Sequence, residues 1–340
     1  MSCSFIDVAR QLLGDASITF ADAHSGGNSR LVKLVSSQGR SYAMKQYPDE
    51  GELGRRRIDR EQAAFTFFAD NGFHAVPRQL AVDQQHRLAL VEWVEGHQPA
   101  STDSSSVDAM VAFLSQLHRL RDHKTVAKLG DATDAVFSLD DLLGQLQRRI
   151  DTFEEAVTEY PLLQHYLQSS LIPAVATVVE WVGDRARKVG VDHAHVLEQD
   201  YRTLSPSDFG SHNMLKTPSG YSFIDFEYFG WDDPAKLIGD FVWRPEPKVD
   251  AVMKQRFADA LLSLYGDDPM LESRYHLYGP LLGLCWGLIV LNPLRREWAQ
   301  ARGIAIEKQR AMVGKCIDKS KMLVSRVSET VGADTYALNL

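Results

Sequence analysis

The sequence contains few cysteines, and they form no pattern. Only three occur in 340 residues, at Cys3, Cys285 and Cys316. Because the number is odd and no two stand at metal-ligand spacing, we expect neither a disulfide framework nor a cysteine metal site. This cysteine usage is typical of a reducing compartment, so we expect a cytoplasmic protein.

Long apolar runs and an excess of positive charge are also lacking. The longest apolar stretch, residues 279–294, is nearer the length of a buried core helix than of a membrane span. The N-terminus has no basic start followed by a long apolar core, so it does not read as a secretory signal. The formal net charge of -8 argues against nucleic acid or an anionic membrane as the main partner.

Length and local pattern predict an α+β protein with two lobes. A chain of 340 residues exceeds what one compact core holds. Residues 31–35 and 41–47 are β-rich and flank a glycine-containing turn, which predicts a hairpin. Residues 55–70 have apolar side chains at helical spacing, and residues 87–96 read as an apolar strand.

The rest of the chain is predicted to be mainly helical, with one short hairpin. Pro161 and Pro173 interrupt the helical pattern, and Pro173 either kinks a helix or begins one. The expected helices cover residues 107–120, 139–160, 162–189 and most of the chain from about 249, and the hairpin covers 213–227. We therefore predict an N-terminal lobe over residues 1–95 and a C-terminal lobe over 96–340, with a helical insertion at about 100–200.

Three oxygen-bearing side chains flank the predicted hairpin at 213–227. Asn213 precedes its first strand, Asp225 lies near the end of its second, and Asp208 stands five residues before Asn213. Pairing the strands brings the three together. Any one of them alone is ordinary turn chemistry. As a set they predict a Mg²⁺ site made by Asn213 and Asp225, because Mg²⁺ prefers oxygen ligands, with Asp208 left to accept a proton from a substrate hydroxyl.

These residues carry a resemblance to a known family. The chain reads PSDFGSHN, then IDFEY, then GWDDPAKLIGDF. This is similar to the signature of the aminoglycoside phosphotransferase and choline kinase superfamily, which reads approximately H-G-D-x-x-x-x-N, I-D-F/W-E and G-x-x-D-P-x-x-D-L. Pro206 stands where most relatives have histidine. The resemblance implies a bilobal protein-kinase-like fold, with a small β-rich N-lobe and a larger, mainly helical C-lobe.

The resemblance also implies how the first lobe would bind a nucleotide. Gly26, Gly27 and Ser29 precede the first strand of the predicted hairpin, where backbone N–H groups can approach phosphate oxygens. Lys45 lies in the next strand, and Glu61 shares the apolar stripe of the following helix. A carboxylate on such a stripe is costly to bury without a partner, so we expect a Lys45–Glu61 pair.

Further assignments in this part of the chain are less specific. Glu92 and Val94 occupy the expected hinge, where the family binds adenine through backbone groups. His118 is interpreted as structural rather than catalytic. The charged cluster at residues 54–61 is interpreted as a solvated helix start.

The implied activity is transfer of the γ-phosphoryl group of ATP or GTP to a hydroxyl of a small molecule. Catalytic Asp208 would take the hydroxyl proton, and Mg²⁺ and the nucleotide would be the cofactors. The acceptor would be a sugar, an amino sugar or an amino alcohol. Acidic and aromatic residues at 225–250 could hold a cationic acceptor or could serve the scaffold, and Trp286, Glu297 and Trp298 are further candidates for the acceptor wall.

Two other functions remain as alternatives. A nucleotide-binding pseudokinase acting as a scaffold is one, because Pro206 departs from the family pattern. The joint presence of Lys45, Asp208, Asn213 and Asp225 argues against it. A protein kinase is the other, but the chain lacks the H-R-D and A-P-E elements, and glutamate follows Asp-Phe where protein kinases have glycine.

Overall fold

A computed structural model describes residues 5–25, 29–48, 52–246 and 248–333 of the chain. The chain separates into two compact units. We call the first the sheet unit, which comprises Met1–Ala100, Arg119–Thr133 and Asp208–Gly230. The second, the helical unit, comprises Ser101–His118, Asp134–Ser207 and Trp231–Leu340. The lobe boundary predicted at residue 95/96 and the helical insertion stay predictions.

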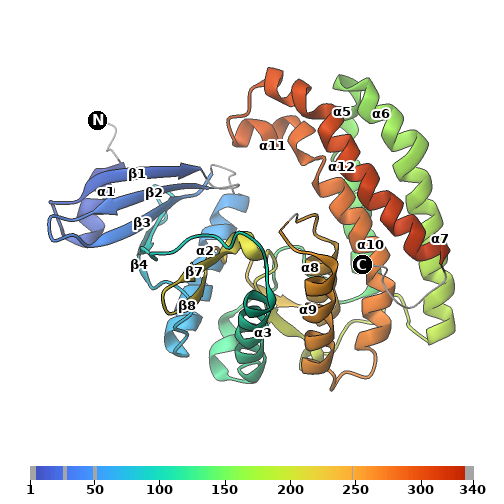
Figure 1. Cartoon of the computed structure of the whole chain (residues 1–340), viewed down its shortest axis with the longest axis horizontal. Coiled ribbons are helices and arrows are strands. Elements are labelled where there is room, and N and C mark those ends of the chain that lie inside the picture. The colour runs from blue at the N-terminus through green and yellow to red at the C-terminus, as the bar shows by residue number, and fades with distance from the viewer. Residues whose placement is uncertain (1–4, 26–28, 49–51, 247, 334–340) are drawn as a thin grey trace. The chain divides into compact units, whose positions relative to one another are not determined.

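The sheet unit is built on a five-stranded antiparallel sheet with the strand order β1-β2-β3-β5-β4 (Figure 1). Its strands are β1 (Thr19–Ser25), β2 (Arg30–Val35), β3 (Ser41–Gln46), β4 (Gln79–Asp83) and β5 (Leu88–Glu92). The predicted hairpin is confirmed as β2 and β3, but β5 ends at Glu92, before the predicted Gly96. Sequence reasoning missed β1 and β4. Every residue of β4 is half-buried, so the strand has no alternation of buried and exposed residues that would identify it.

Two helices pack on the sheet. From α1 (Phe5–Leu13), Val8 and Ala9 join a core cluster that contains Val32, Met44 and Leu90. From α2 (Glu52–Asp70), Ile58 packs with Tyr47 and Ala89 in a second cluster. Met44 and Tyr47 thus belong to different clusters, as the alternation of side chains along a strand requires. Lys45 shares the face of Tyr47, which is the face toward α2.

The remainder of the sheet unit joins a second hairpin to α2. Strands β7 (Met214–Thr217) and β8 (Gly220–Phe223) pair with Met214 opposite Phe223. Directly after β8, Phe226 packs edge-on against Phe68 of α2 with ring centroids 4.6 Å apart. Two 3₁₀ turns, η1 (Lys124–Lys128) and η4 (Ser211–Asn213), complete the unit. The aromatic contacts hold the residues after β8 against the helix that carries Glu61.

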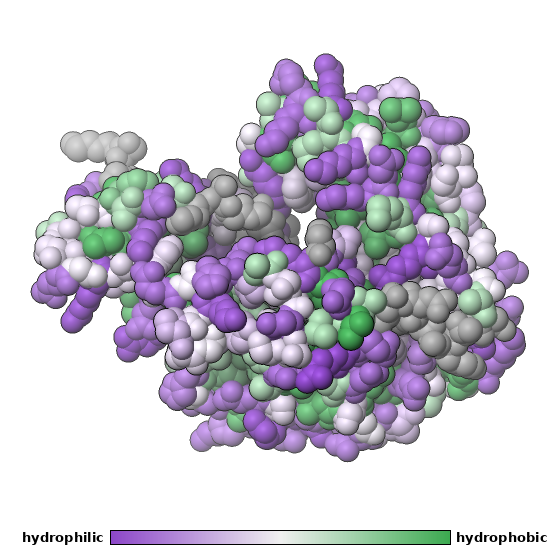
Figure 2. Space-filling view, in the orientation of Figure 1, coloured by the Kyte–Doolittle hydropathy of each residue, from purple (hydrophilic) through white to green (hydrophobic). Residues whose placement is uncertain are grey.

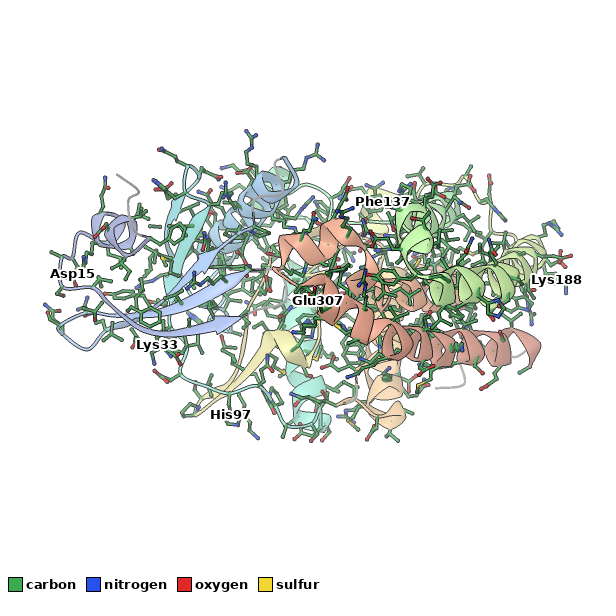
Figure 3. All side chains as sticks on the ribbon, turned by 90° about the horizontal axis from the view of Figure 1, so that it is seen from above. Asp15, Lys33, His97, Phe137, Lys188 and Glu307 are labelled. Carbon is green, nitrogen blue, oxygen red and sulfur yellow. The ribbon has the colours of Figure 1, made fainter. Side chains whose placement is uncertain are left out.

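The helical unit surrounds the buried helix α10 (Leu271–Ile289), which packs against α4, α7, α8 and α12. The other elements are α3 (Ser104–Arg119), α4 (Leu139–Asp151), α5 (Glu154–Glu159), α6 (Pro161–Tyr166), the π-helical turn η2 (Leu167–Leu171), α7 (Ile172–Val189), η3 (Gln199–Tyr201), β6 (Thr203–Ser205), β9 (Gly230–Asp232), α8 (Pro234–Trp243), α9 (Ala251–Leu264), η5 (Asn292–Leu294), α11 (Arg296–Ala301) and α12 (Ile306–Gly332). Figure 3 shows α7, with Lys188 near its end, and α12, with Glu307 near its start, running side by side.

Prolines divide the predicted long helices into shorter ones. Pro161 and Pro173 both occupy the first turn of a helix, where a missing N–H costs nothing. Residues 162–189 accordingly form most of α6, a π-helical turn and α7, whereas the single helix predicted at 139–160 is interrupted at Thr152 and Phe153, where no proline stands. Helix α8, which follows Asp233, was not predicted. Its apolar and charged residues are nearly all buried, so no amphipathic period identifies it.

The apolar stretch expected to form a core helix does so. Residues Leu271–Leu294 are long and apolar enough to cross a membrane by length and composition alone, and 72% of the most apolar window is buried within the protein. The visible surface of each unit is mostly hydrophilic, with hydrophobic residues in small groups (Figure 2).

Buried ion pairs organise the segment after β9. Asp233 caps α8 by accepting a hydrogen bond from the Ala235 N–H at 2.8 Å. Its carboxylate also pairs with Arg274 of α10, at 2.7 Å from Nε to Oδ2 and 3.0 Å from Nη2 to Oδ1. Lys236 lies between Asp232, at 3.1 Å, and Asp240, at 2.7 Å. Asp232 and Asp233 are fully buried, so these two carboxylates of the 225–250 segment serve the scaffold, which is one of the two alternatives for that segment.

Asp233→Ala is expected to destabilise the helical unit by about 3 kcal/mol or more, because it leaves the Arg274 guanidinium buried without this partner and removes a helix cap. Urea unfolding followed by tryptophan fluorescence measures the loss. The matched control is Asp250→Ala, which removes the exposed cap of α9 and should cost about 1 kcal/mol. Equal losses in the two variants would contradict the structural role of the Asp233–Arg274 pair.

Candidate active site

Lys45 of β3 lies at the centre of a cluster of carboxylates in the sheet unit. Its Nζ is 3.0 Å from Glu61 Oε1, 2.7 Å from Asp225 Oδ1 and 3.2 Å from Glu227 Oε2. The predicted Lys45–Glu61 pair is thus present in the structure. Burial lowers the pKa of Lys45, but the three carboxylates outweigh it and raise this pKa well above its ordinary value. The ammonium group therefore stays charged.

Glu61 is held on several sides. Its Oε2 accepts a hydrogen bond from the Tyr47 hydroxyl, and its Oε1 accepts one from the Phe226 N–H at 3.0 Å. Its side chain is buried on α2 against the sheet. Burial raises the pKa of Glu61 to about 7, although the charge of Lys45 acts in the opposite direction. Glu61 therefore connects β3, α2 and the segment after β8 through one carboxylate.

Sequence reasoning missed two charged residues of this cluster. Glu227 is fully buried, and its Oε1 lies 3.7 Å from Arg57 Nη1. Burial opposes the charge on Glu227, but Lys45 and Arg57 outweigh it and hold the pKa of Glu227 below its usual range. Arg57 is itself 8% exposed, so the interpretation of residues 54–61 as a solvated helix start is wrong for it. The one available signal was that Arg57 lies four residues before Glu61, on the same helix face.

Asp225 follows β8 in a left-handed backbone conformation, with φ of 68°. Few residues other than glycine adopt this conformation, although aspartate and asparagine are enriched there. The pKa of Asp225 is raised by burial and by the charges of Glu227 and Asp208, and Lys45 opposes the shift. The Ile224 N–H donates to the Asn213 carbonyl at 3.0 Å, so the hairpin places Asp225 beside Asn213 as its spacing predicted.

The loop from Asp208 to Asn213 is fixed by its own side chains. Asn213 Nδ2 donates to the Asp208 carbonyl at 2.9 Å, which leaves Oδ1 as the other polar atom of the amide. The side chain of Asp208 is 26% exposed, and its Oδ2 is 3.3 Å from His212 Nε2. His212 is a third site residue that sequence reasoning missed. Just before the loop, the Ser207 N–H donates to Ser205 Oγ at 2.9 Å around the buried Pro206.

Of the other residues predicted to bind the nucleotide, the structure describes some and not others. Gly26 and Gly27 lie outside the described residues, and Ser29 is half-buried just before β2. Glu92 ends β5 and pairs with Arg78, at 2.7 Å between Oε1 and Nη2. Within the described part of the chain, the backbone N–H and C=O of Val94 make no hydrogen bond, so both are available to a ligand.

The candidate acceptor residues of the helical unit are already engaged with neighbours. Trp286 Nε1 donates to Asp240 Oδ1 at 3.1 Å, and the guanidinium of Arg244 lies 4.9 Å from the centre of the Trp286 ring. The guanidinium of Arg302 stacks on Trp298 at 3.9 Å. Of the two tryptophans considered near residue 240, Trp231 is 7% exposed and Trp243 is fully buried. These two pack inside the protein.

The donor set beside Lys45 fits Mg²⁺. Asn213 retains an amide oxygen and Asp225 retains Oδ2. Burial raises the pKa of Asp225, the charges of Glu227 and Asp208 add to the shift, and a bound cation would counter it. Across the described ranges, no three histidine, cysteine or acidic side chains are grouped to hold a metal ion. A site of two oxygen ligands agrees with this, because Mg²⁺ takes phosphate oxygens and waters for its remaining positions.

The arrangement of a buried strand lysine, a helix glutamate, and an Asp–Asn loop beside a second aspartate is that of the protein-kinase-like phosphotransferases. The comparisons with known proteins agree with this class. The model of the phosphotransferase enzyme family matches residues 21–272, and the chain belongs to that family. It is a small-molecule kinase.

Solved structures confirm the predicted fold, although no curated protein sequence matches the chain. The gentamicin complex of APH(2'')-IIa is 15% identical, with a TM-score of 0.59 over 94% of this chain and 96% of that chain. The choline kinase LicA from Streptococcus pneumoniae is 15% identical, with a TM-score of 0.58 over 97% and 98%. The streptomycin–ATP complex of APH(2'')-IIa is 14% identical, with a TM-score of 0.56 over 95% and 98%. At these identities the likeness concerns the fold.

Glu61 is expected to make the stability of the sheet unit depend on pH. Its pKa is about 7 in the folded chain, against an ordinary value of 4.5, so the folded chain binds the proton more tightly. The stabilisation is present below about pH 4.5 and is lost as pH rises through about 7. Thermal unfolding from pH 4.5 to 8 should therefore show the wild type losing stability relative to Glu61→Gln, which cannot titrate.

The control for this prediction is Glu180→Gln, on the exposed side of α7. Its unfolding midpoint should follow that of the wild type across the whole pH range. Parallel pH profiles for the wild type and Glu61→Gln would show that burial does not shift the pKa of Glu61.

Proposed function

We propose that the protein transfers the γ-phosphoryl group of ATP or GTP to a hydroxyl of a small molecule. The observation that carries the proposal is the position of Lys45, whose ammonium is fixed by Glu61 and lies 2.7 Å from Asp225. A cation held at this point can neutralise nucleotide phosphates, and phosphoryl transfer depends chiefly on such positioning and charge neutralisation.

Asp208 is the proposed catalytic base. Its carboxylate is partly exposed, as a group that touches a substrate must be, and the Asn213 amide holds its backbone. In this role Asp208 orients the acceptor hydroxyl and accepts its proton as the new P–O bond forms and the bond to the leaving diphosphate breaks. His212, 3.3 Å from Asp208 Oδ2, restrains the carboxylate.

The nucleotide would be held by the sheet unit. Lys45 would bind the α- and β-phosphates, with Glu61 fixing its position, and Gly26, Gly27 and Ser29 would cover the phosphates through backbone N–H groups. The free N–H and C=O of Val94, next to Glu92 and Trp93, suit the edge of a purine base. Asn213 and Asp225 would bind Mg²⁺, which when present neutralises the charge on the phosphate oxygens.

The proposed acceptor is a sugar, an amino sugar or an amino alcohol. The support comes from the relatives: one structure of this fold holds gentamicin, one holds streptomycin with ATP, and another is a choline kinase. The cysteines add support for a cytoplasmic setting, because Cys285 and Cys316 are both free and buried. We propose no nucleic-acid partner and no membrane insertion.

Asp208→Asn is expected to lower turnover at least 100-fold and to leave nucleotide affinity within about threefold, since a general base contributes roughly this much. ADP release on a panel of sugars, amino sugars, aminoglycosides and choline, together with nucleotide titration, measures both quantities. Asp200→Asn, at an exposed site eight residues earlier, is the matched control and should leave both unchanged. Full activity in Asp208→Asn would overturn the assignment. Nucleotide binding by the wild type without turnover of any acceptor would favour the scaffold hypothesis.

Two substitutions at Asn213 separate its two proposed tasks. Asn213→Ala removes the oxygen ligand and should raise the Mg²⁺ concentration for half-maximal activity at least tenfold. Asn213→Asp keeps an oxygen ligand but loses the hydrogen bond to the Asp208 carbonyl. It should lower kcat with a smaller change in Mg²⁺ requirement. Activity measured over a Mg²⁺ titration distinguishes the variants, and an identical Mg²⁺ requirement in all three proteins would contradict a ligand role for Asn213.

A further inference from the structure

A small pocket in the helical unit carries a surplus of positive charge. Its volume is about 180 Å³, and it lies where α4 meets the end of α10 and η5. The side chains that line it are mostly charged or polar: Asp134, Gln145, Arg148, Arg149, Thr152, Phe153, Leu288, Asn292 and Arg295. Three arginines against one aspartate leave a surplus of two positive charges. The proposed function uses none of these residues.

Arg149 is anchored and still has a donor to spare. Its Nη2 lies 2.6 Å from Asp134 Oδ2, which fixes the guanidinium. Its Nε is buried and has no hydrogen-bond partner among the residues that the structure describes. The backbone at Asp134, before α4, is also fixed, because Gln145 Nε2 donates to the Asp134 carbonyl at 3.2 Å. Phe137, labelled in Figure 3, lies between this segment and the start of α4.

The other two arginines have no acidic partner in the described part of the chain. Among the described residues, neither Arg148 nor Arg295 forms an ion pair, and Arg295 Nη1 reaches only Asn292 Oδ1 at a long 3.4 Å. Burial lowers the pKa of Arg295, the charge of Arg149 adds to this shift, and Glu297 opposes it. Guanidinium groups brought this close together repel one another unless an anion lies between them.

We propose that this pocket binds an anionic oxygen group, namely a phosphate or a carboxylate. The planar guanidinium matches both groups, because its parallel N–H donors meet two oxygens at once. Gln145 and Thr152 supply neutral polar atoms at the wall. An anion there would neutralise the surplus charge of the three arginines.

The pocket and the candidate acceptor residue Trp286 share one helix, because Leu288 of the pocket wall also belongs to α10. Burial raises the pKa of the Cys285 thiol in the same helix, and the charges of Arg149 and Asp240 act on it in opposite directions. Asp240 in turn accepts the Trp286 N–H. The anionic group can come from two sources. It is part of the phosphoryl acceptor, an assignment that rests on the proposed function, or it is a separate small anion.

Binding is tested with inorganic phosphate as the probe, by isothermal titration and by its effect on the unfolding midpoint. The wild type should bind one phosphate. Arg149→Gln and Arg295→Gln should each lower the affinity for phosphate at least tenfold. Arg295→Gln keeps the Arg149–Asp134 pair intact, so it remains informative if the other variant unfolds. Arg296→Gln, at the neighbouring residue and outside this pocket, is the matched control and should bind like the wild type.

Lys45→Ala tests whether phosphate binds in this pocket or in the proposed nucleotide site. If it binds in the pocket, Lys45→Ala should keep the wild-type affinity for phosphate. Phosphate binding that is absent, or equal in the wild type and both pocket variants, overturns the proposal. This outcome is independent of kinase activity, so failure of the proposed function leaves the binding test standing.

Kinetics with an acceptor that is turned over identify the source of the anion. If the acceptor carries it, phosphate competes with the acceptor, and Arg295→Gln raises the acceptor KM at least tenfold with little change in kcat. If a separate anion fills the pocket, phosphate does not compete, and the KM of Arg295→Gln stays near the wild-type value while the binding defect remains. Both results support the pocket and assign it to one source.

Discussion

The charge of one lysine, buried among carboxylates, is the constraint on which the sheet unit depends. Lys45 lies within 3.2 Å of Glu61, Asp225 and Glu227, and it could not stay charged at this depth without them. The carboxylates in turn come from α2 and from the chain after β8. Satisfying one ammonium group therefore fixes how the sheet, α2 and the second hairpin meet. It also leaves a local excess of negative charge, which is the condition for binding a cation with its phosphates.

The left-handed conformation at Asp225 is maintained by the same contacts. Non-glycine residues in this region cost of order 1 kcal/mol or more and persist only where neighbours over-determine them. Here the hydrogen bond from the Phe226 N–H to Glu61 follows directly after Asp225, and the Phe226 ring packs on Phe68. In this conformation the Asp225 carboxylate reaches Lys45, while the next residue, Phe226, packs on α2. Glu227 then extends to Lys45 and Arg57.

Much of this site could be predicted from the sequence, because its members follow short local rules. Glu61 follows from a helical stripe, Lys45 from the need of that carboxylate for a partner, and Asn213 and Asp225 from the length of a hairpin. Glu227 could not be predicted in the same way, since a carboxylate within an acidic segment has no local signature of burial. For Arg57 the one local signal is its place four residues before Glu61 on the same helix face. Strands β1 and β4 and helix α8 were missed for a related reason: neither strand alternates buried and exposed residues, and α8 is buried on nearly every side. The individual roles of the site residues stay predictions.

Pro206, the departure from the family pattern, is consistent with a loop that is shaped by its backbone. Proline fixes its own φ and biases Ser205 toward an extended conformation. Ser205 is buried at the end of β6, and its hydroxyl accepts the Ser207 N–H, so the turn closes within three residues. Ser207 then adopts φ of 62° and redirects the chain into Asp208. A histidine side chain would have to reach across the loop to achieve the same restraint. With proline the restraint is covalent, and Asn213 and His212 give the loop its polar contacts on the other side of Asp208.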